Sequence, residues 1–333
     1  MPDIALGQTG FSLNDALGLL LGKHDRFEPR VRKATWAGVA GFPRVNTHFY
    51  YLSFRDGLPT VSEFAEYLKW QMVPFCIPRR DRARTASMVA TATDDAERTM
   101  HFVRQFEKAR DLFIKTREQQ RRAGEPGELI LFVLLEWALR APQLVSKMYL
   151  KTSAQMPVHG TDGIHAGMHE DGSTLLLYWG ESKLHKGLSD ALDSAFESVG
   201  EFVMNADRRK REIDIVRDHM DLGEDQQAFR GALLDYLDPY SEQGNQRRDV
   251  FACFIGFDYA KYEQLRRLPP DKIEAEFARA FDSRVAGMLD LVGNRLSAKG
   301  MDVVNFEFFL LPFPSVADFR MAFFQAAGIA NAE

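Results

Sequence analysis

The chain has only two cysteines, Cys76 and Cys253, and they lie far apart in the sequence. They cannot form a disulfide framework or, on their own, a cysteine metal site. No apolar run approaches the roughly 18–20 residues of a membrane helix. The chain also begins without the basic start and long apolar stretch of a secretion signal. We therefore expect a cytoplasmic protein that does not enter a membrane.

Nucleotide-binding motifs are missing too. The sequence has no phosphate loop and no dinucleotide fingerprint, so we expect no nucleotide cofactor on this chain. It also lacks the nucleophile elbow of serine hydrolases. The net charge of −5 argues against a nucleic-acid binder that relies on overall charge alone. Local basic patches could still bring an enzyme to a polyanion. Aromatic residues make up 12% of the 333 residues, which excludes global disorder.

The order of the expected elements indicates an α/β protein. After residue 120 the patterns predict a helix, three strands, a helix, a strand, a helix, a strand and a final helix. This order is typical of a mixed central sheet flanked by helices. The expected strands cover residues 144–152, 158–166, 173–183, 250–257 and 303–311, and a polar helical insert covers about 207–238.

Residues 1–120 are predicted to form an N-terminal α+β region, separate from a domain at 121–333. A strand is expected near 47–54, followed by a helix at about 60–72 that a capping box, Thr60 with Glu63, would open. Residues 79–93 are polar and basic and predict an exposed loop. Asp94 then opens a long amphipathic helix. We expect this region to dock a partner protein.

The triplet Glu181-Ser182-Lys183 ends the third expected strand after residue 120. Successive side chains on a strand point to opposite faces, so Glu181 and Lys183 share one face and Ser182 points away. Taken alone, a Glu-x-Lys triplet carries little information, because chance produces about one in a chain of this composition. Its context decides whether it marks a site.

Asp162 supplies that context. A hairpin that turns at Asp171-Gly172 pairs residues whose numbers sum to about 343, which places Asp162 opposite Glu181. Opposed carboxylates repel each other unless a cation compensates them. Two carboxylates with waters and a substrate phosphate are a usual Mg²⁺ site. We therefore predict Mg²⁺, or alternatively Mn²⁺, on these two residues. Lys183 would orient or deprotonate the attacking water and stabilise charge on phosphorus.

A helix carboxylate is expected to assist, and the residues leave two candidates. Glu128 lies in the first turn of the helix before the strands, where a negative charge is favourable in any case. Glu136 interrupts an apolar run, where a lone carboxylate is costly unless it is paired. Physical reasoning from the residues alone does not choose between them.

Three segments carry a resemblance to a known family: Gly127-Glu128-Leu129, residues 160–165 (Gly-Thr-Asp-Gly-Ile-His) and residues 178–183 (Tyr-Trp-Gly-Glu-Ser-Lys). Together they resemble the PD-(D/E)xK nuclease superfamily and, more narrowly, the HamA family, nuclease subunits of the Hachiman antiphage defence system. The resemblance covers about residues 120–330 and is weak over the first hundred. It favours Glu128 as the helix carboxylate.

This resemblance implies a restriction-endonuclease-like core and a metal-dependent deoxyribonuclease that hydrolyses phosphodiester bonds. It also implies a helicase-like partner protein of the HamB type. DNA would be contacted by His165, Lys186, Arg208 and Arg209, which lie near the predicted site or in a basic cluster. The alternative is a catalytically silent subunit of the same fold that binds DNA or a partner.

Overall fold

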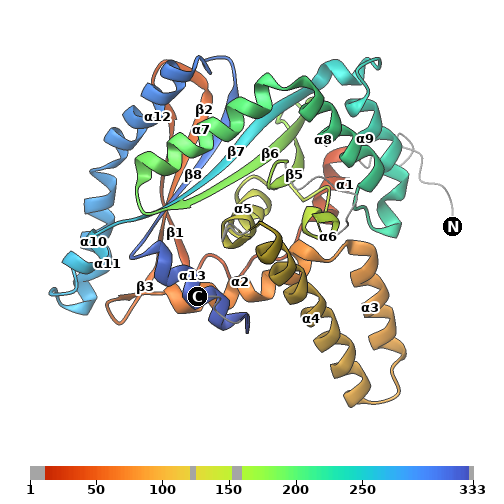
Figure 1. Ribbon diagram of the computed structural model, residues 1–333, viewed down its shortest axis with the longest axis horizontal. Coiled ribbons are helices and arrows are strands. Elements are labelled where there is room, and N and C mark those ends of the chain that lie inside the picture. The colour runs from red at the N-terminus through yellow and green to blue at the C-terminus, as the bar shows by residue number, and fades with distance from the viewer. Residues whose placement is uncertain (1–11, 121–124, 152–159, 330–333) are drawn as a thin grey trace.

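The computed structural model describes residues 12–120, 125–151 and 160–329. Its centre is a six-stranded mixed sheet in the order β1-β2-β8-β7-β6-β5 (Figure 1). The four inner strands run parallel, and the edge strands β1 and β5 are antiparallel to their neighbours. The strands are β1 (Val31–Val39), β2 (Phe42–Leu52), β5 (Gly163–Met168), β6 (Leu175–His185), β7 (Arg247–Asp258) and β8 (Asn305–Phe313), with a separate short pair β3 (Phe54–Arg55) and β4 (Leu58–Pro59). The predicted α/β class is confirmed.

Helices cover both faces of the sheet (Figure 1). Helices α7 (Leu188–Met204) and α12 (Val285–Lys299) lie on one face, and α2 (Val61–Cys76), α5 (Glu125–Ala138) and α13 (Val316–Ala326) lie on the other. The remaining helical segments are α1 (Leu13–Leu20), α3 (Arg79–Thr91), α4 (Asp95–Gln120), α6 (Lys147–Lys151), α8 (Ala206–His219), η1 (Glu224–Phe229), α9 (Arg230–Leu237), η2 (Gln243–Gln246), α10 (Lys261–Gln264) and α11 (Pro270–Asp282).

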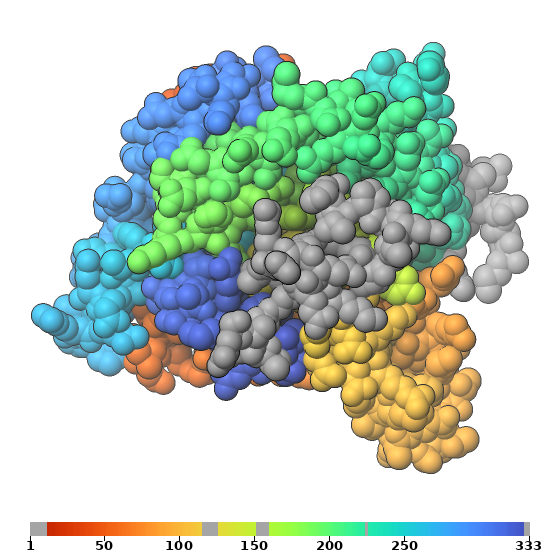
Figure 2. All heavy atoms as spheres, in the orientation of Figure 1, coloured from red at the N-terminus to blue at the C-terminus, as the bar shows by residue number. Residues whose placement is uncertain are grey.

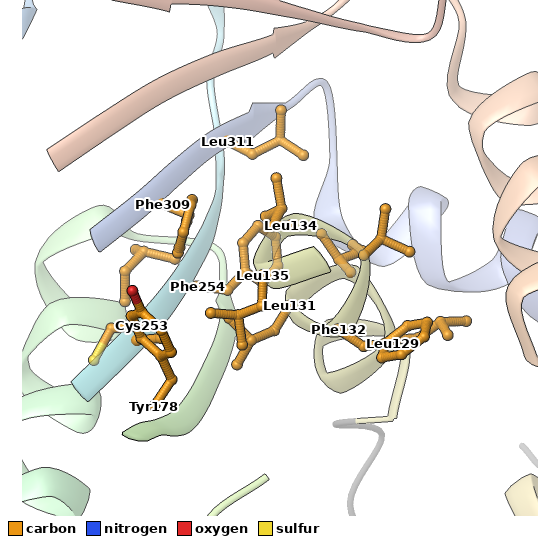
Figure 3. Close-up of a cluster of buried hydrophobic side chains, with 14 of the residues drawn as sticks. Leu129, Leu131, Phe132, Leu134, Leu135, Tyr178, Cys253, Phe254, Phe309 and Leu311 are labelled. Carbon is orange, nitrogen blue, oxygen red and sulfur yellow. The ribbon is translucent and has the colours of Figure 1, made fainter. Parts of the chain in front are cut away.

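Helix α5 is buried on all sides because its middle is apolar all round. Its side chains Leu131, Leu134 and Leu135 lie over Phe254 of β7 and Phe309 of β8 (Figure 3). This packing fixes α5 against the sheet, where the helix also contacts β6, the strand that carries Glu181 and Lys183.

The N-terminal strands belong to the same sheet as the rest. Strand β2 pairs in parallel with β8, so that Val45 is opposite Phe306 and Phe49 is opposite Leu310. The boundary predicted near residue 120 therefore does not separate two hydrophobic cores. The strand pattern at 47–54 indicated a strand correctly, but a local pattern does not show which distant strand completes its hydrogen bonds.

The strand predicted at 144–152 is wrong. Leu144 and Val145 are buried in an irregular segment, and α6 follows it. Only an isolated bridge, Gln143 to His165, joins this segment to β5. A short apolar run shows burial but not conformation. The strand predicted at 158–166 begins only at Gly163, and residues 158 and 159 lie outside the described residues.

The exposed loop predicted at 79–93 is also wrong, because Arg79–Thr91 is helix α3. None of its residues is fully buried, and it lacks the apolar stripe that would have indicated a helix. Together with the first half of α4, it forms a helical arm that projects from the body of the molecule (Figures 1 and 2). Asp94 does open α4, since it accepts a hydrogen bond from the Glu97 N–H at 2.8 Å.

Two further predictions about helices can be compared with the structure. The helical insert expected at 207–238 is confirmed as α8, η1 and α9. Thr60 does precede α2, but its hydroxyl bonds to Ser53 instead of capping the helix. The helix also continues past Pro74 to Cys76.

Candidate active site

The hairpin of β5 and β6 has the predicted register. Gly163 is opposite Gly180 and Met168 is opposite Leu175, so the paired numbers sum to 343. Asp162 directly precedes β5, and its N–H donates to the Gly180 carbonyl at 2.8 Å. Asp162 is therefore fixed at the open end of the hairpin, beside Glu181.

The Asp162 carboxylate is held by Ser182. One oxygen, Oδ2, accepts hydrogen bonds from the Ser182 N–H and the Ser182 hydroxyl, each at 2.8 Å. Ser182 faces α5, where a Cβ on Gly127 would lie 3.1 Å from the hydroxyl oxygen. The glycine thus lets the start of α5 approach this strand closely. The sequence pattern correctly placed Ser182 on the face opposite Glu181 but did not reveal this role.

Glu181 and Lys183 meet on the other face of β6, which α7 covers. The Lys183 Nζ lies 2.6 Å from the Glu181 Oε1, and the side chains are 21% and 12% exposed, respectively. This pairing confirms that the two residues share a face. Both groups are largely buried yet remain open to a small ion or a substrate oxygen.

Burial and neighbouring charges shift the pKa values of both Glu181 and Lys183 upward. Burial and the nearby Asp162 carboxylate raise the pKa of Glu181 to about 7, and Lys183 only partly offsets them. Burial acts to lower the pKa of Lys183, but Glu181 outweighs burial, and the net shift is upward. Lys183 is therefore an ammonium group at neutral pH. It can orient an oxygen and stabilise negative charge, but it is not a ready proton acceptor.

The arrangement fits the predicted cation. Within the described ranges no group of three or more His, Cys, Asp or Glu side chains is placed to hold a metal. Mg²⁺ needs less, because it is commonly held by one or two carboxylates and completes its shell with waters and substrate phosphate. Burial and, after it, the Asp162 carboxylate raise the pKa of Glu181, and a bound cation would offset both effects. Asp162 and Glu181 are the residues that would hold it.

A comparison with protein families places the whole chain. The HamA family model matches residues 40–327, which is most of the chain. The chain belongs to the HamA family. Membership supports its predicted place as a Hachiman defence subunit, and the match begins well before residue 120. A search of curated proteins found no match.

In this HamA-family chain the two helix carboxylates have different surroundings. Glu128 is buried in the first turn of α5, next to the glycine that packs on Ser182. Glu136 lies about two turns further along, where its carboxylate accepts hydrogen bonds from His24 and the Gly22 N–H, both at 2.9 Å. Glu136 is thus a buried carboxylate that is paired, and its hydrogen bonds to His24 and Gly22 account for its burial without a catalytic role. Glu128 remains the predicted auxiliary carboxylate.

The DNA-binding role predicted for His165 is wrong. The side chain is 1% exposed, and its Nδ1 bonds to the Ala141 carbonyl at 2.8 Å. Burial lowers its pKa to about 4, so the ring is neutral as well as inaccessible. Strand β5 lies at the edge of the sheet, but segments distant in sequence cover His165. A local sequence pattern therefore does not indicate its burial.

The other three predicted DNA contacts lie at the surface or near it. Lys186 is exposed just after β6. On α8, Arg208 pairs with Glu201 at 3.4 Å, and Arg209 donates to the carbonyls of Phe202 and Val203. These arginines help to join α8 to the end of α7, and their contact with DNA stays a prediction.

No helix in the described parts of the chain has the length and apolar character to cross a bilayer.

Proposed function

We propose that this HamA-family protein is a metal-dependent DNA nuclease that hydrolyses phosphodiester bonds. The observation that carries the proposal is that the end of one hairpin brings Asp162 next to Glu181, whose pKa the Asp162 carboxylate helps to raise, while Lys183 pairs with Glu181. Two carboxylates and an ammonium group are what a metal-assisted attack on a phosphodiester requires. The family of the chain supports a role in antiphage defence.

Each residue has a separate task in this reaction. Asp162 and Glu181 would hold Mg²⁺, which when bound supplies Lewis-acid chemistry at a phosphoryl oxygen. Ser182 keeps the Asp162 carboxylate oriented through its two hydrogen bonds. Lys183, held at 2.6 Å from Glu181, directs its protons to the attacking or bridging oxygen and stabilises the charge that develops on phosphorus.

We further propose that the protein acts with a helicase-like partner, as the family resemblance implies. The projecting arm of α3 and the start of α4 is suited to such a contact. Its apolar side chains Met88, Phe102 and Val103 are 37%, 57% and 48% exposed. The rest of the region predicted to dock a partner includes two strands of the central sheet, so we place the contact on the arm.

The test is degradation of plasmid DNA in Mg²⁺ by the chain alone and by its complex with the partner. Asp162→Asn, Glu181→Gln and Lys183→Met should each lower the cleavage rate at least 100-fold. Glu197→Gln, an exposed carboxylate change on α7, should leave it unaltered. Equal cleavage by all variants would contradict the proposal. Absence of cleavage by the wild-type complex would favour a silent DNA-binding subunit.

A further inference from the structure

A cavity lies on the same face of the sheet as Glu181, between the strands and the helical insert. Its volume is about 290 Å³, near the lower end of the roughly 300–1,000 Å³ range of ligand pockets. The strands contribute Trp179, Arg247 and Asp249, and the insert contributes α8 and the end of α9. A cavity of this size suits a group no larger than one nucleotide.

The indole of Trp179 leaves a donor unused in this cavity. Trp179 is 1% exposed, and its Nε1–H has no hydrogen-bond partner among the described residues. Buried donors are nearly always paired, so an orphan N–H calls for an explanation. Because Trp179 lines the cavity, an acceptor bound there would complete the pairing.

The cavity also gathers positive charge. Four cationic side chains line it against two carboxylates: Arg209, Lys210, Arg217 and Arg247 against Asp214 and Asp249. Arg247 already pairs with Asp249 at 3.2 Å, and Arg209 bonds to main-chain carbonyls. In the described part of the chain, Lys210 and Arg217 form no ion pair. They lie seven residues apart on one face of α8 and are free to bind an anion.

The position of the cavity connects it with the candidate active site. Trp179 and Glu181 are two residues apart on β6, so they share a face and lie about 7 Å apart along the strand. Ile213, Leu237 and Pro239 give the cavity an apolar wall beside its cationic edge. An apolar wall with cations and one N–H donor matches a nucleotide unit, which has a flat base or sugar and a phosphate.

We propose that this cavity is a subsite for a nucleotide of the DNA strand next to the scissile phosphate. The inference rests on the proposed nuclease function and names where the strand continues. Lys210 and Arg217 pair with a backbone phosphate, and the Trp179 N–H donates to one of its oxygens. The helical insert therefore positions the strand, and the carboxylates at the hairpin end act on it.

The test is binding, measured in EDTA so that no strand is cut. Fluorescence anisotropy with a labelled oligonucleotide of ten thymidines gives the affinity of the full chain. Lys210→Ala/Arg217→Ala should weaken binding about 10-fold. The slope of log K against log salt concentration should become less steep by roughly 0.7 for each phosphate that is no longer neutralised. Trp179→Phe, which keeps an aromatic ring but lacks the donor, should weaken binding about 3-fold and leave the salt slope unchanged.

Arg211→Ala is the matched control, because Arg211 is an exposed cation on α8 that does not line the cavity. The proposal is overturned if the control weakens binding as much as the double variant, or if neither changes it. Thymidine 5′-phosphate that competes as strongly as the strand would also overturn it, in favour of a free-nucleotide site. Because the assay measures binding without cleavage, its result does not depend on whether the protein cuts DNA. Failure of the subsite proposal and failure of the nuclease proposal can therefore be told apart.

Discussion

Ser182 donates two hydrogen bonds to the same oxygen of Asp162, one from its N–H and one from its hydroxyl, each at 2.8 Å. The other Asp162 oxygen accepts neither bond. A carboxylate fixed through one oxygen in this way presents the other in a defined direction. Groups that orient metal ligands commonly change metal affinity 10- to 100-fold when they are removed.

Ser182→Ala should therefore weaken Mg²⁺ or Mn²⁺ binding about 10-fold, at the low end because the backbone N–H bond remains. The melting temperature of the chelated protein should change little. Isothermal titration with Mn²⁺ measures the affinity, and Ser189→Ala on α7 is the exposed control. Unchanged affinity in Ser182→Ala would mean that the Ser182 hydroxyl does not orient a metal-binding carboxylate.

Exchanging the two helix carboxylates for amides should separate stability from catalysis. Burial acts to raise the pKa of Glu136, but His24, His165 and the Gly22 N–H outweigh it, and the pKa is lowered. Glu136→Gln breaks this buried pairing and should cost about 3 kcal/mol of unfolding free energy. Urea unfolding measures the loss.

Glu128→Gln should instead reduce DNA cleavage at least 10-fold with less effect on stability. The same urea curves and the plasmid assay compare the two variants directly. The assignment of Glu128 fails if Glu136→Gln alone abolishes cleavage in a protein that remains folded.

His165 should make the fold sensitive to acid. Its pKa is about 4 in the folded protein and near 6.5 when unfolded, because burial disfavours the charged ring. The stability it contributes is present above pH 6.5 and is lost as the pH falls toward 4. Between pH 7 and pH 5 the loss should be about 2 kcal/mol.

His165→Asn keeps a donor for the Ala141 carbonyl but does not titrate. This variant should be less stable at pH 7 and should lose about 2 kcal/mol less than the wild type between pH 7 and pH 5. Denaturant unfolding at both pH values supplies the comparison. Parallel losses in the two proteins would show that His165 is not the acid-sensitive group.

The exposed apolar side chains of the helical arm should be dispensable for folding but required for the partner. Phe102→Glu/Val103→Glu changes two exposed side chains, so stability should stay within about 0.5 kcal/mol of the wild type. Complex formation with the helicase-like partner should weaken at least 10-fold in a pull-down or titration. Met321→Glu, on the exposed side of α13, is the control. Normal complex formation by the arm variant would place the partner elsewhere.

Local patterns predicted the part of the site that depends on one hairpin. The turn at Asp171-Gly172 and the alternation along β6 determine which side chains meet, so Asp162 and Glu181 could be paired by counting residues. The pairing of Glu181 with Lys183 follows from the same alternation. These features depend on neighbours close in sequence.

Features that depend on distant segments could not be predicted in this way. The sequence leaves Glu136 as a catalytic candidate, whereas in the structure it pairs with His24, 112 residues away. His165 looked accessible because nothing local indicates that α5 and the segment at Ala141 cover it. The parallel pairing of β2 with β8 likewise joins segments about 260 residues apart.

A crystal grown with Mn²⁺ and measured for anomalous scattering tests the central claim most directly. We predict a single peak about 2.2 Å from one oxygen of Asp162 and one of Glu181, with Lys183 close by but not bound to it. A map with no peak between these two carboxylates, at a Mn²⁺ concentration that supports cleavage, would contradict the account.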